Sequence, residues 1–510
     1  MPPVSLPDGA SLAQLRKQAK DLRDLARAGV PGAVDIVAEY HPKGAHPVTL
    51  TGAQLVVARH NGFASWARLE QHLEMIERYR RSPDEVDQTS GAVADFLAFA
   101  CLRFGGDDEP SRWERAARVL AAHPGLTRSS IHVTAAAADE ASVRAQLAAE
   151  PALACHEGGP YGWVPLLYLA SARHDPRISA EATLGTARAL LEHGADPNTG
   201  YLWHGLYPPY TAATCALGSH DEDEHPHAFA LAELLLTAGA DANDGQLLYN
   251  RQFGRDDRHL VLLLEHGLGR GDGGPWAARF GAKADSPREM LRGQLWWAIV
   301  HDRRDRVALL VEHGADVRTP YAAPGGRPTA LRNSDGLTPA ELAMLSGYPE
   351  LAGWLVAHGA ARPALDETNA LIAAVLAGDR DTAARLRAYA PAARERRPGL
   401  MAWAAAGRKL DGLALLAELG FDVNARGRLD IPLEQQWFTP LHEAAQSGDV
   451  EMARLLLRLG ADPNVSSEWG ATPLESARQH GQDAVAELLE PLTGTDRARP
   501  RRATPPTDTS

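Results

Sequence analysis

Cysteine is scarce in this chain, and the three that occur are far apart. Cys101, Cys155 and Cys215 are odd in number among 510 residues, which excludes a disulfide framework and predicts a reducing, cytoplasmic setting. The longest apolar run, residues 91–102, is interrupted by Asp95 and is too short to span a bilayer. The first residues lack the basic flank and apolar core of a signal peptide. We therefore expect a soluble intracellular protein with no membrane partner.

Basic charge is also in deficit. The formal net charge is −13, and no segment of the repeats concentrates arginine on one face, so a nucleic-acid partner is not expected. Arginine greatly outnumbers lysine, a bias typical of GC-rich bacterial genomes.

Motifs for catalysis are missing as well. We find no nucleophile elbow, Walker loop, Cys-x-x-Cys pair or paired catalytic carboxylates. Gly269, Gly271 and Gly274 have the spacing of a dinucleotide loop, but they follow a helix and enclose Asp272, which would repel phosphate. The sequence predicts no catalytic residue, no cofactor and no metal site.

A repeated unit lies near the C-terminus, in residues 438–489. Two Thr-Pro-Leu starts, at Thr439 and Thr472, are 33 residues apart. Each threonine can cap a helix whose first turn accepts the following proline. Gly448 ends the first helix, and Gly460 supplies a left-handed cap after the second.

This unit resembles the ankyrin repeat, and weaker copies extend the resemblance over residues 92–490, as in the long multi-repeat proteins common in bacteria. The resemblance implies an all-α solenoid of about eleven helix-turn-helix units with hairpin fingers, which binds a protein partner on its concave side. It also implies that His442 hydrogen-bonds between neighbouring repeats. The predicted inner helices start near Asp95, Ile131, Val164, Thr211, Gly245, Gly293, Thr338, Asn369, Leu400, Thr439 and Thr472.

Two further segments flank the predicted solenoid. Residues 1–85 have the apolar spacing of four short helices and form a small helical module, which either covers the first repeat or docks independently. Residues 493–510 combine arginine with proline and threonine and are predicted to be a disordered basic tail.

Repeat spacing lengthens in the middle of the chain. The intervals from Val164 to Thr211, Gly245 to Gly293 and Gly293 to Thr338 all exceed the regular period. Insertions in repeat proteins fall in loops on one face, often the binding face. Residues 163–335 are therefore the predicted site of function.

Aromatic residues concentrate in one of these insertions. Rigid rings on an exposed loop are typical of binding hot spots, although the same rings could cover the loop as a local core. The residues are Tyr201, Trp203, His204, Tyr207 and Tyr210. A glycine-rich finger at 267–276 ends in Trp276, which we assign to the same partner-binding set.

A second candidate lies on two inner helices. Asn250 and Arg251 occupy positions where the repeat normally has small residues, so they either form an internal polar network or face a ligand. Tyr249, Trp296 and Trp297 would join them in a concave pocket.

The insert from His220 to His227 mixes acids and histidines, but its contiguous spacing does not match a defined zinc site. It is read as a solvated loop.

The main hypothesis is a non-catalytic scaffold that binds a macromolecular partner. The alternative is an enzyme or small-molecule binder that uses His204, Asn250 and Arg251 as its polar groups.

Overall fold

The protein was analysed as a computed structural model, which describes residues 6, 9–42, 44, 48–86, 90–222, 224–321, 336–427 and 437–493. The chain divides into two compact units, residues 1–291 and 292–510, which are described separately. The predicted tail lies outside the described residues from 494 onward. Residues 322–335, in the predicted insertion before Thr338, also lie outside them.

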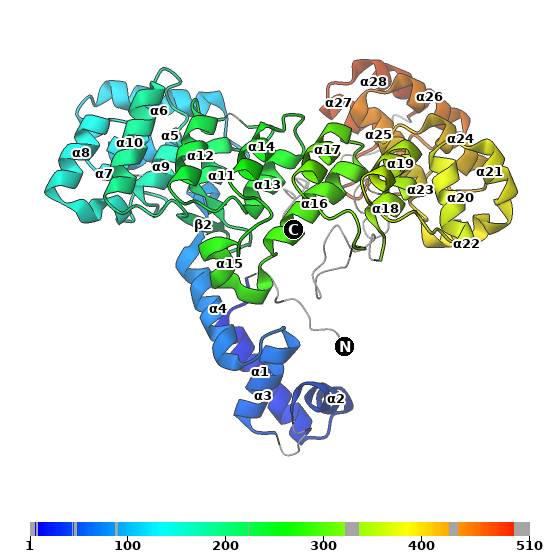
Figure 1. The fold of residues 1–510 in the computed structure, drawn as a ribbon, viewed down its shortest axis with the longest axis horizontal. Coiled ribbons are helices and arrows are strands. Elements are labelled where there is room, and N and C mark those ends of the chain that lie inside the picture. The colour runs from blue at the N-terminus through cyan, green and yellow to red at the C-terminus, as the bar shows by residue number, and fades with distance from the viewer. Residues whose placement is uncertain are drawn as a thin grey trace. The chain divides into compact units, whose positions relative to one another are not determined.

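The first unit begins with a four-helix module: α1 (Leu12–Arg27), α2 (Pro31–Tyr40), α3 (Leu50–His60) and α4 (Trp66–Tyr79) (Figure 1). Ser11, Thr49 and Ser65 accept backbone N–H groups at three of the four helix starts. Its core contains Leu15, Val37, Val56 and Leu69, while Leu25 of α1 is 48% exposed. The module thus has its own apolar interior.

Five helix pairs follow in the first unit. They are α5 (Ala92–Ala100) with α6 (Pro110–Ala122), α7 (Ile131–Ala136) with α8 (Glu140–Ala149), α9 (Pro165–Ser171) with α10 (Ala180–Glu192), α11 (Ala212–Leu217) with α12 (Ala228–Thr237), and α13 (Gly245–Gln252) with α14 (Arg258–Glu265). The long interval after α14 contains an additional helix, α15 (Gly274–Phe280).

The chain passes from the first unit to the second within α16 (Pro287–Val300). The later pairs are α16 with α17 (Arg304–Glu312), α18 (Pro339–Leu345) with α19 (Pro349–Ala357), α20 (Glu367–Leu376) with α21 (Arg380–Arg385), α23 (Leu400–Ala406) with α24 (Leu410–Glu418), α25 (Pro440–Ser447) with α26 (Val450–Arg458), and α27 (Pro473–Gln479) with α28 (Asp483–Leu489). A short α22 (Ala390–Arg396) precedes α23. Every predicted inner-helix start lies within three residues of a helix start, except Gly293, because α16 begins already at Pro287.

Capping explains why these helices start where they do. Thr338 and Thr472 form reciprocal capping boxes with Glu341 and Glu475, each threonine being followed by proline at the first helical position. At Thr439 the partner is His442, whose other ring nitrogen bonds the carbonyl of Ala471 in the next repeat, with 2.9 Å between the atoms. This bond confirms the predicted inter-repeat role of His442.

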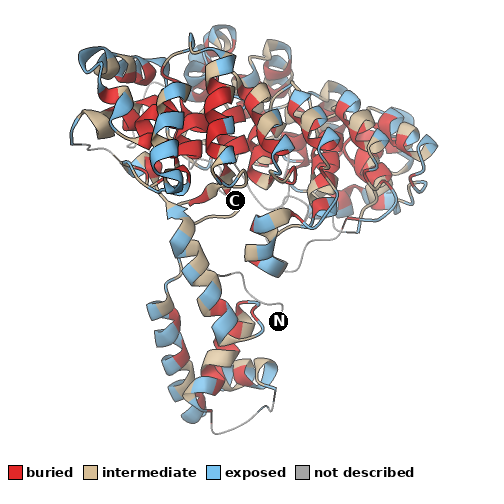
Figure 2. Cartoon of the chain, turned by 60° about the vertical axis from the view of Figure 1, so that its left-hand side comes forward, coloured by how far each residue is buried: buried red, intermediate tan, exposed pale blue. Residues whose placement is uncertain are grey.

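The inner helices carry most of the core. All residues of α7, α9 and α11 are buried, because each short helix has neighbours on both sides and its own outer helix behind it. Figure 2 shows the buried positions concentrated where helices of neighbouring repeats meet. The described fold is the expected all-α helical-repeat class.

Three short strands interrupt the helices of the first unit. β1 (Arg80–Arg81) continues from α4 and pairs in parallel with β2 (Gly200–Trp203), so that Arg81 lies opposite Trp203. β2 also pairs antiparallel with β3 (Tyr210–Thr211), so the aromatic insertion of residues 199–210, called the finger below, closes as a hairpin. The finger therefore joins the module to the repeats.

Candidate functional site

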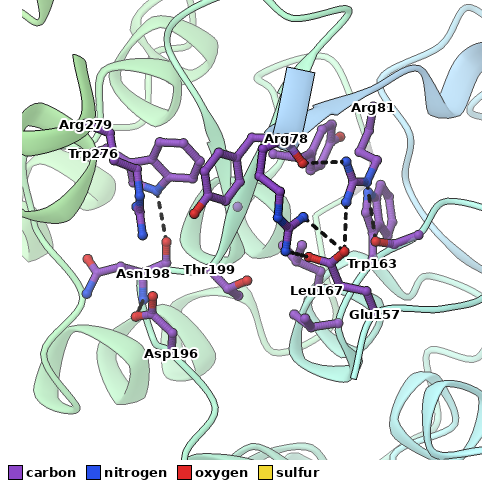
Figure 3. A pocket seen from close by; sticks show the side chains of 15 residues that line it. Arg78, Arg81, Glu157, Trp163, Leu167, Asp196, Asn198, Thr199, Trp276 and Arg279 are labelled. Atoms are coloured by element: carbon purple, nitrogen blue, oxygen red, sulfur yellow. Dashed lines mark hydrogen bonds and ion pairs between the residues drawn. The ribbon is translucent and has the colours of Figure 1, made fainter. Parts of the chain in front are cut away.

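A cleft of about 160 Å³ opens where the module meets the repeats of the first unit. Four segments contribute to it: the end of α4 with β1, the loop before α9, the finger around β2, and α15 (Figure 3). Its lining includes Arg78, Tyr79, Arg81, Glu157, Trp163, Leu167, Asp196, Asn198, Thr199, Gly200, Tyr201, Trp276 and Arg279.

Close backbone approach fixes the finger wall of the cleft. A Cβ atom on Gly200 would lie 2.8 Å from the carbonyl oxygen of Tyr210 and 3.2 Å from the indole of Trp276. Only glycine fits there without displacing the paired strand.

Asn198 anchors the base of the finger. Its side-chain amide donates to the Gly239 carbonyl at 2.9 Å, and its side-chain oxygen accepts the N–H of Asp241 at 2.8 Å. Its own carbonyl accepts the indole N–H of Trp276 at 2.9 Å. One residue thus ties the finger to the next repeat and to α15.

One side of the cleft holds an internal carboxylate. Arg78 donates two hydrogen bonds to Glu157, at 2.7 and 3.1 Å, and Arg81 donates a third at 3.1 Å (Figure 3). The hydrogen bonds that Arg78 donates to Glu157 raise the pKa of Arg78 above its ordinary value. Arg81 also donates to backbone carbonyls, including that of Gly162 at 3.4 Å, so these two guanidinium groups are fixed by the fold.

The other side presents a third guanidinium, that of Arg279. Its central carbon lies 4.6 Å from the ring centre of Trp276 and 5.1 Å from that of Tyr79. Such cation–π contacts hold the group in place. Its Nη1 atom is buried and has no hydrogen-bond partner in the structure.

Two of the predicted aromatic residues line the cleft, and the finger rings also form a local core. Tyr201 is 2% exposed, and its ring centre lies 5.1 Å from that of Trp163 and 5.5 Å from that of Tyr210. Tyr207 packs on Phe280 at 4.5 Å, and Trp276 on Tyr79 at 4.9 Å. Tyr201 and Trp276 reach the cleft lining, whereas Trp203, Tyr207 and Tyr210 do not contribute to it.

His204 belongs to the connection between module and finger. Its Nε2 lies 2.9 Å from a carboxylate oxygen of Asp84, and its Nδ1 lies 3.1 Å from the hydroxyl of Ser82. Its φ angle of 51° lies in the left-handed region. These contacts give the side chain a structural part and leave it outside the lining of the cleft.

The polar residues of α13 take part in an internal network. Arg251 donates to the carbonyls of Leu217 and Ser219, both at 3.1 Å, and to Glu224 at 2.7 Å. Asn250 accepts a hydrogen bond at 2.8 Å from Gln246, which also donates to the hydroxyl of Tyr210. Both Asn250 and Arg251 are buried, so of the two readings of this helix these bonds favour the network. The ring of Tyr249 packs on that of Phe253, 5.3 Å between centres.

Trp296 and Trp297 fall in the second unit, where both are buried in its core. The Trp297 ring stacks on His301 at 4.0 Å, and the guanidinium of Arg306 lies 4.9 Å from its centre. These contacts give the Trp297 ring a packing role in the core of the second unit.

The acidic insert is partly folded into the first unit. His225 is 6% exposed, and burial holds its pKa well below the ordinary value, while His227 contacts the Ile178 carbonyl at 2.6 Å. Within the described part of the chain, no cluster of histidine, cysteine and acidic residues could hold a metal ion. None of the described helices combines the length and apolarity needed to cross a bilayer.

The sequence interpretation missed Arg78, Arg81, Glu157 and Arg279, although they supply most of the charge of the cleft. Three come from segments outside the predicted central region or at its edge. The one signal in the sequence was the spacing from Trp276 to Arg279, which brings a ring and a cation together on one helix turn.

Comparison with known proteins identifies the type of repeat in residues 400–497. Residues 400–497 match the family model for ankyrin repeats in three copies. The chain is 45% identical over 51 residues to the mouse ARF GTPase-activating protein GIT2, a match that covers 10% of this chain and 7% of that protein. It is 44% identical over 69 residues to the mouse ankyrin repeat and SOCS box protein 16, which covers 14% of each chain.

A third relative is the Drosophila melanogaster E3 ubiquitin-protein ligase Ufd4, 36% identical over 94 residues. That match covers 18% of this chain and 3% of the ligase. The chain therefore matches only small parts of these three relatives.

Proposed function

Because the chain carries ankyrin repeats, we propose that it is a protein-binding scaffold that holds a peptide segment of its partner in the cleft between the module and the finger. The supporting observation is a cleft with aromatic walls and fixed charged groups, built on a hairpin that Asn198 and Gly200 hold in place. Rigid rings bind with little loss of conformational freedom, which suits recognition of a peptide. The proposal restricts the predicted region of function, residues 163–335, to the part that belongs to the first unit, before residue 292.

Binding is favoured over catalysis by the chemistry of the lining. The described residues that line the cleft include no histidine, cysteine, serine or lysine that could act as a nucleophile or a base near neutral pH. The carboxylate of Glu157 already accepts three hydrogen bonds from arginines. We also propose a cytoplasmic location, which the three unpaired cysteines support.

A synthetic library of random dodecapeptides with free C-termini tests this function. Peptides retained by the full chain are identified by mass spectrometry, and their affinities are measured for wild type and for Thr199→Trp, which fills the cleft. Thr237→Trp is the matched control, because Thr237 is an exposed residue at the end of α12 and does not line the cleft.

The proposal expects that Thr199→Trp abolishes binding and that Thr237→Trp retains it. Circular dichroism confirms that both variants are folded. Equal binding to both variants would place the peptide elsewhere and refute the cleft as the binding site.

A further inference from the structure

We infer that the cleft is selective for a carboxylate: it binds an acidic peptide, with the carboxylate paired to Arg279. The inference rests on the proposed peptide-binding function and adds the chemical class of the ligand. The shared chemistry is a carboxylate group, from a Glu or Asp side chain or from a free C-terminus.

The position of Arg279 is the first step. Its guanidinium lies 4.6 Å from the ring centre of Trp276 and 5.1 Å from that of Tyr79, and the two ring centres are 4.9 Å apart, so the cation packs beside this pair of rings. The indole N–H of Trp276 is itself bonded to the Asn198 carbonyl, so the ring beside the cation is fixed. A guanidinium held in this way loses little freedom when it binds an anion.

The unused hydrogen-bonding capacity of Arg279 is the second step. Nη1 is withdrawn from solvent and donates to no group in the structure. An unpaired buried donor is unfavourable, and a charged donor more so. The side chain as a whole is half-buried and lines the cleft, so a carboxylate in the cleft can accept hydrogen bonds from its other N–H groups, for which a carboxylate has the matching geometry.

The other two arginines of the cleft already bind a carboxylate. Arg78 and Arg81 face the chain's own Glu157, which they bind with three hydrogen bonds. Arg279 is the remaining guanidinium in the described lining, and among the described residues no ion pair joins it to an acid. The two acids in the lining, Glu157 and Asp196, are outnumbered by the three arginines, which leaves a net positive charge for an anionic ligand.

Asp196 faces the same cleft and limits where the ligand can lie. Its Oδ1 accepts the backbone N–H of Asn198 at 2.8 Å, which holds the carboxylate toward the base of the finger. Asp196 lies beside Asn198 on the Trp276 side of the cleft (Figure 3), so a ligand carboxylate is expected to approach Arg279 from the side turned away from Asp196. Trp163 and Leu167 line the cleft but are almost fully buried, so they support its wall and offer little contact area to a peptide.

A double-mutant cycle between protein and peptide tests the assignment. The probes are library peptides whose binding is abolished by Thr199→Trp, each remade with Glu→Gln or Asp→Asn and, separately, with an amidated C-terminus. Their affinities are measured for wild type and Arg279→Gln. The control variant is Arg115→Gln, because Arg115 is also stacked on a ring, that of Phe99 at 3.9 Å, but lies outside the cleft.

We expect neutralising one carboxylate to weaken binding to the wild type by about tenfold or more, and to have little effect on Arg279→Gln. The sensitive position identifies the source of the carboxylate. Arg279→Lys keeps the charge but loses the planar fork, so it should bind more weakly than wild type and more tightly than Arg279→Gln.

Peptides whose binding is abolished by Thr199→Trp are called cleft-dependent. If such peptides keep their affinity for the wild type after every neutralisation, the carboxylate assignment is wrong, while the proposed function stands. Peptides that tolerate Thr199→Trp would instead contradict the proposed function. The effect of neutralising the peptide is measured on the wild-type protein, so a folding defect in Arg279→Gln cannot produce it.

Discussion

The backbone N–H of His204 donates a hydrogen bond to the carbonyl of Arg81, with 2.8 Å between nitrogen and oxygen. This bond joins the strand after α4 to the finger, although the two residues are far apart in sequence. The ring of His204 adds contacts to Asp84 and Ser82 from the same strand connection. One wall of the cleft therefore depends on a side chain that does not line it.

Replacing this histidine should loosen the module. Asparagine tolerates the left-handed backbone of residue 204 but is too short to reach Asp84, so His204→Asn removes the ring contacts without adding backbone strain. We expect the free energy of unfolding to fall by about 1 kcal/mol and hydrogen exchange to become faster in β1 and β2. His193→Asn is the control, since the ring of His193 bonds to its own helix, at the carbonyl of Ala189. Unchanged exchange in β1 would contradict this role.

A buried ion pair stabilises the first repeat. Arg112 pairs with Asp108 and also donates to the Tyr161 hydroxyl at 3.1 Å, and the two paired side chains are 5% and 2% exposed. Arg112→Met leaves the buried carboxylate of Asp108 without its cation and should destabilise the first unit by about 3–5 kcal/mol. Thermal unfolding measures this loss.

Arg118→Met provides the comparison on the same helix. Arg118 pairs with Glu114, but both side chains are more than two-thirds exposed, at 67% and 71%. Surface pairs of this kind contribute about 0–1 kcal/mol. Similar losses for the two variants would show that the Arg112 pair is not the stabilising contact.

Acid should destabilise the last repeats through His442. Burial lowers its pKa from the ordinary 6.5 to about 4, against the opposing effect of its bond to Ala471 and with a smaller contribution from Arg426. Between these pH values the unfolded chain binds a proton that the folded chain excludes, so the free energy of unfolding falls as the pH decreases from 6.5 to about 4.

Urea unfolding at a series of pH values measures this effect, with His442→Gln expected to flatten the decrease. His480→Gln serves as the control, because His480 is exposed at the end of α27. An unchanged pH dependence in His442→Gln would assign the acid sensitivity to other groups.

Gly200 should be intolerant of a side chain. The Cβ atom of an alanine there would lie 2.8 Å from the Tyr210 carbonyl oxygen and push β2 away from β3. We expect Gly200→Ala to lower the free energy of unfolding by about 1–3 kcal/mol and to weaken the binding of cleft-dependent peptides. Gly125→Ala is the control, since its Cβ would have no neighbour within 4 Å. Calorimetry measures the stability of both variants, and titration measures their peptide affinity. Equal values for Gly200→Ala and Gly125→Ala would mean that the finger adapts to the added side chain.

The helical repeats could be predicted from sequence because their signals are local. Thr439, Pro440 and Gly448 specify the start and end of a helix within one repeat, and the same chemistry recurs at Thr472. Even in the degenerate early units, the spacing of apolar residues located the inner helices. The start of α16 was missed because six further residues before Gly293 continue the helix with no break.

The cleft could not be predicted because it depends on contacts between distant segments. Arg78 meets Glu157, and Arg279 meets Tyr79, across separations that no local pattern encodes. Aromatic density did point to the correct finger. It could not distinguish rings that form the local core, such as Tyr210, from those that reach the cleft, such as Trp276.

Photo-crosslinking tests the central claim most directly. A cleft-dependent peptide carrying benzoylphenylalanine is irradiated with the full chain, and the attachment sites are mapped by mass spectrometry. The account predicts attachment to residues 78–81, 196–201 and 276–279, abolished in Thr199→Trp and retained in Thr237→Trp. Attachment confined to other segments, or unaffected by filling the cleft, would contradict it.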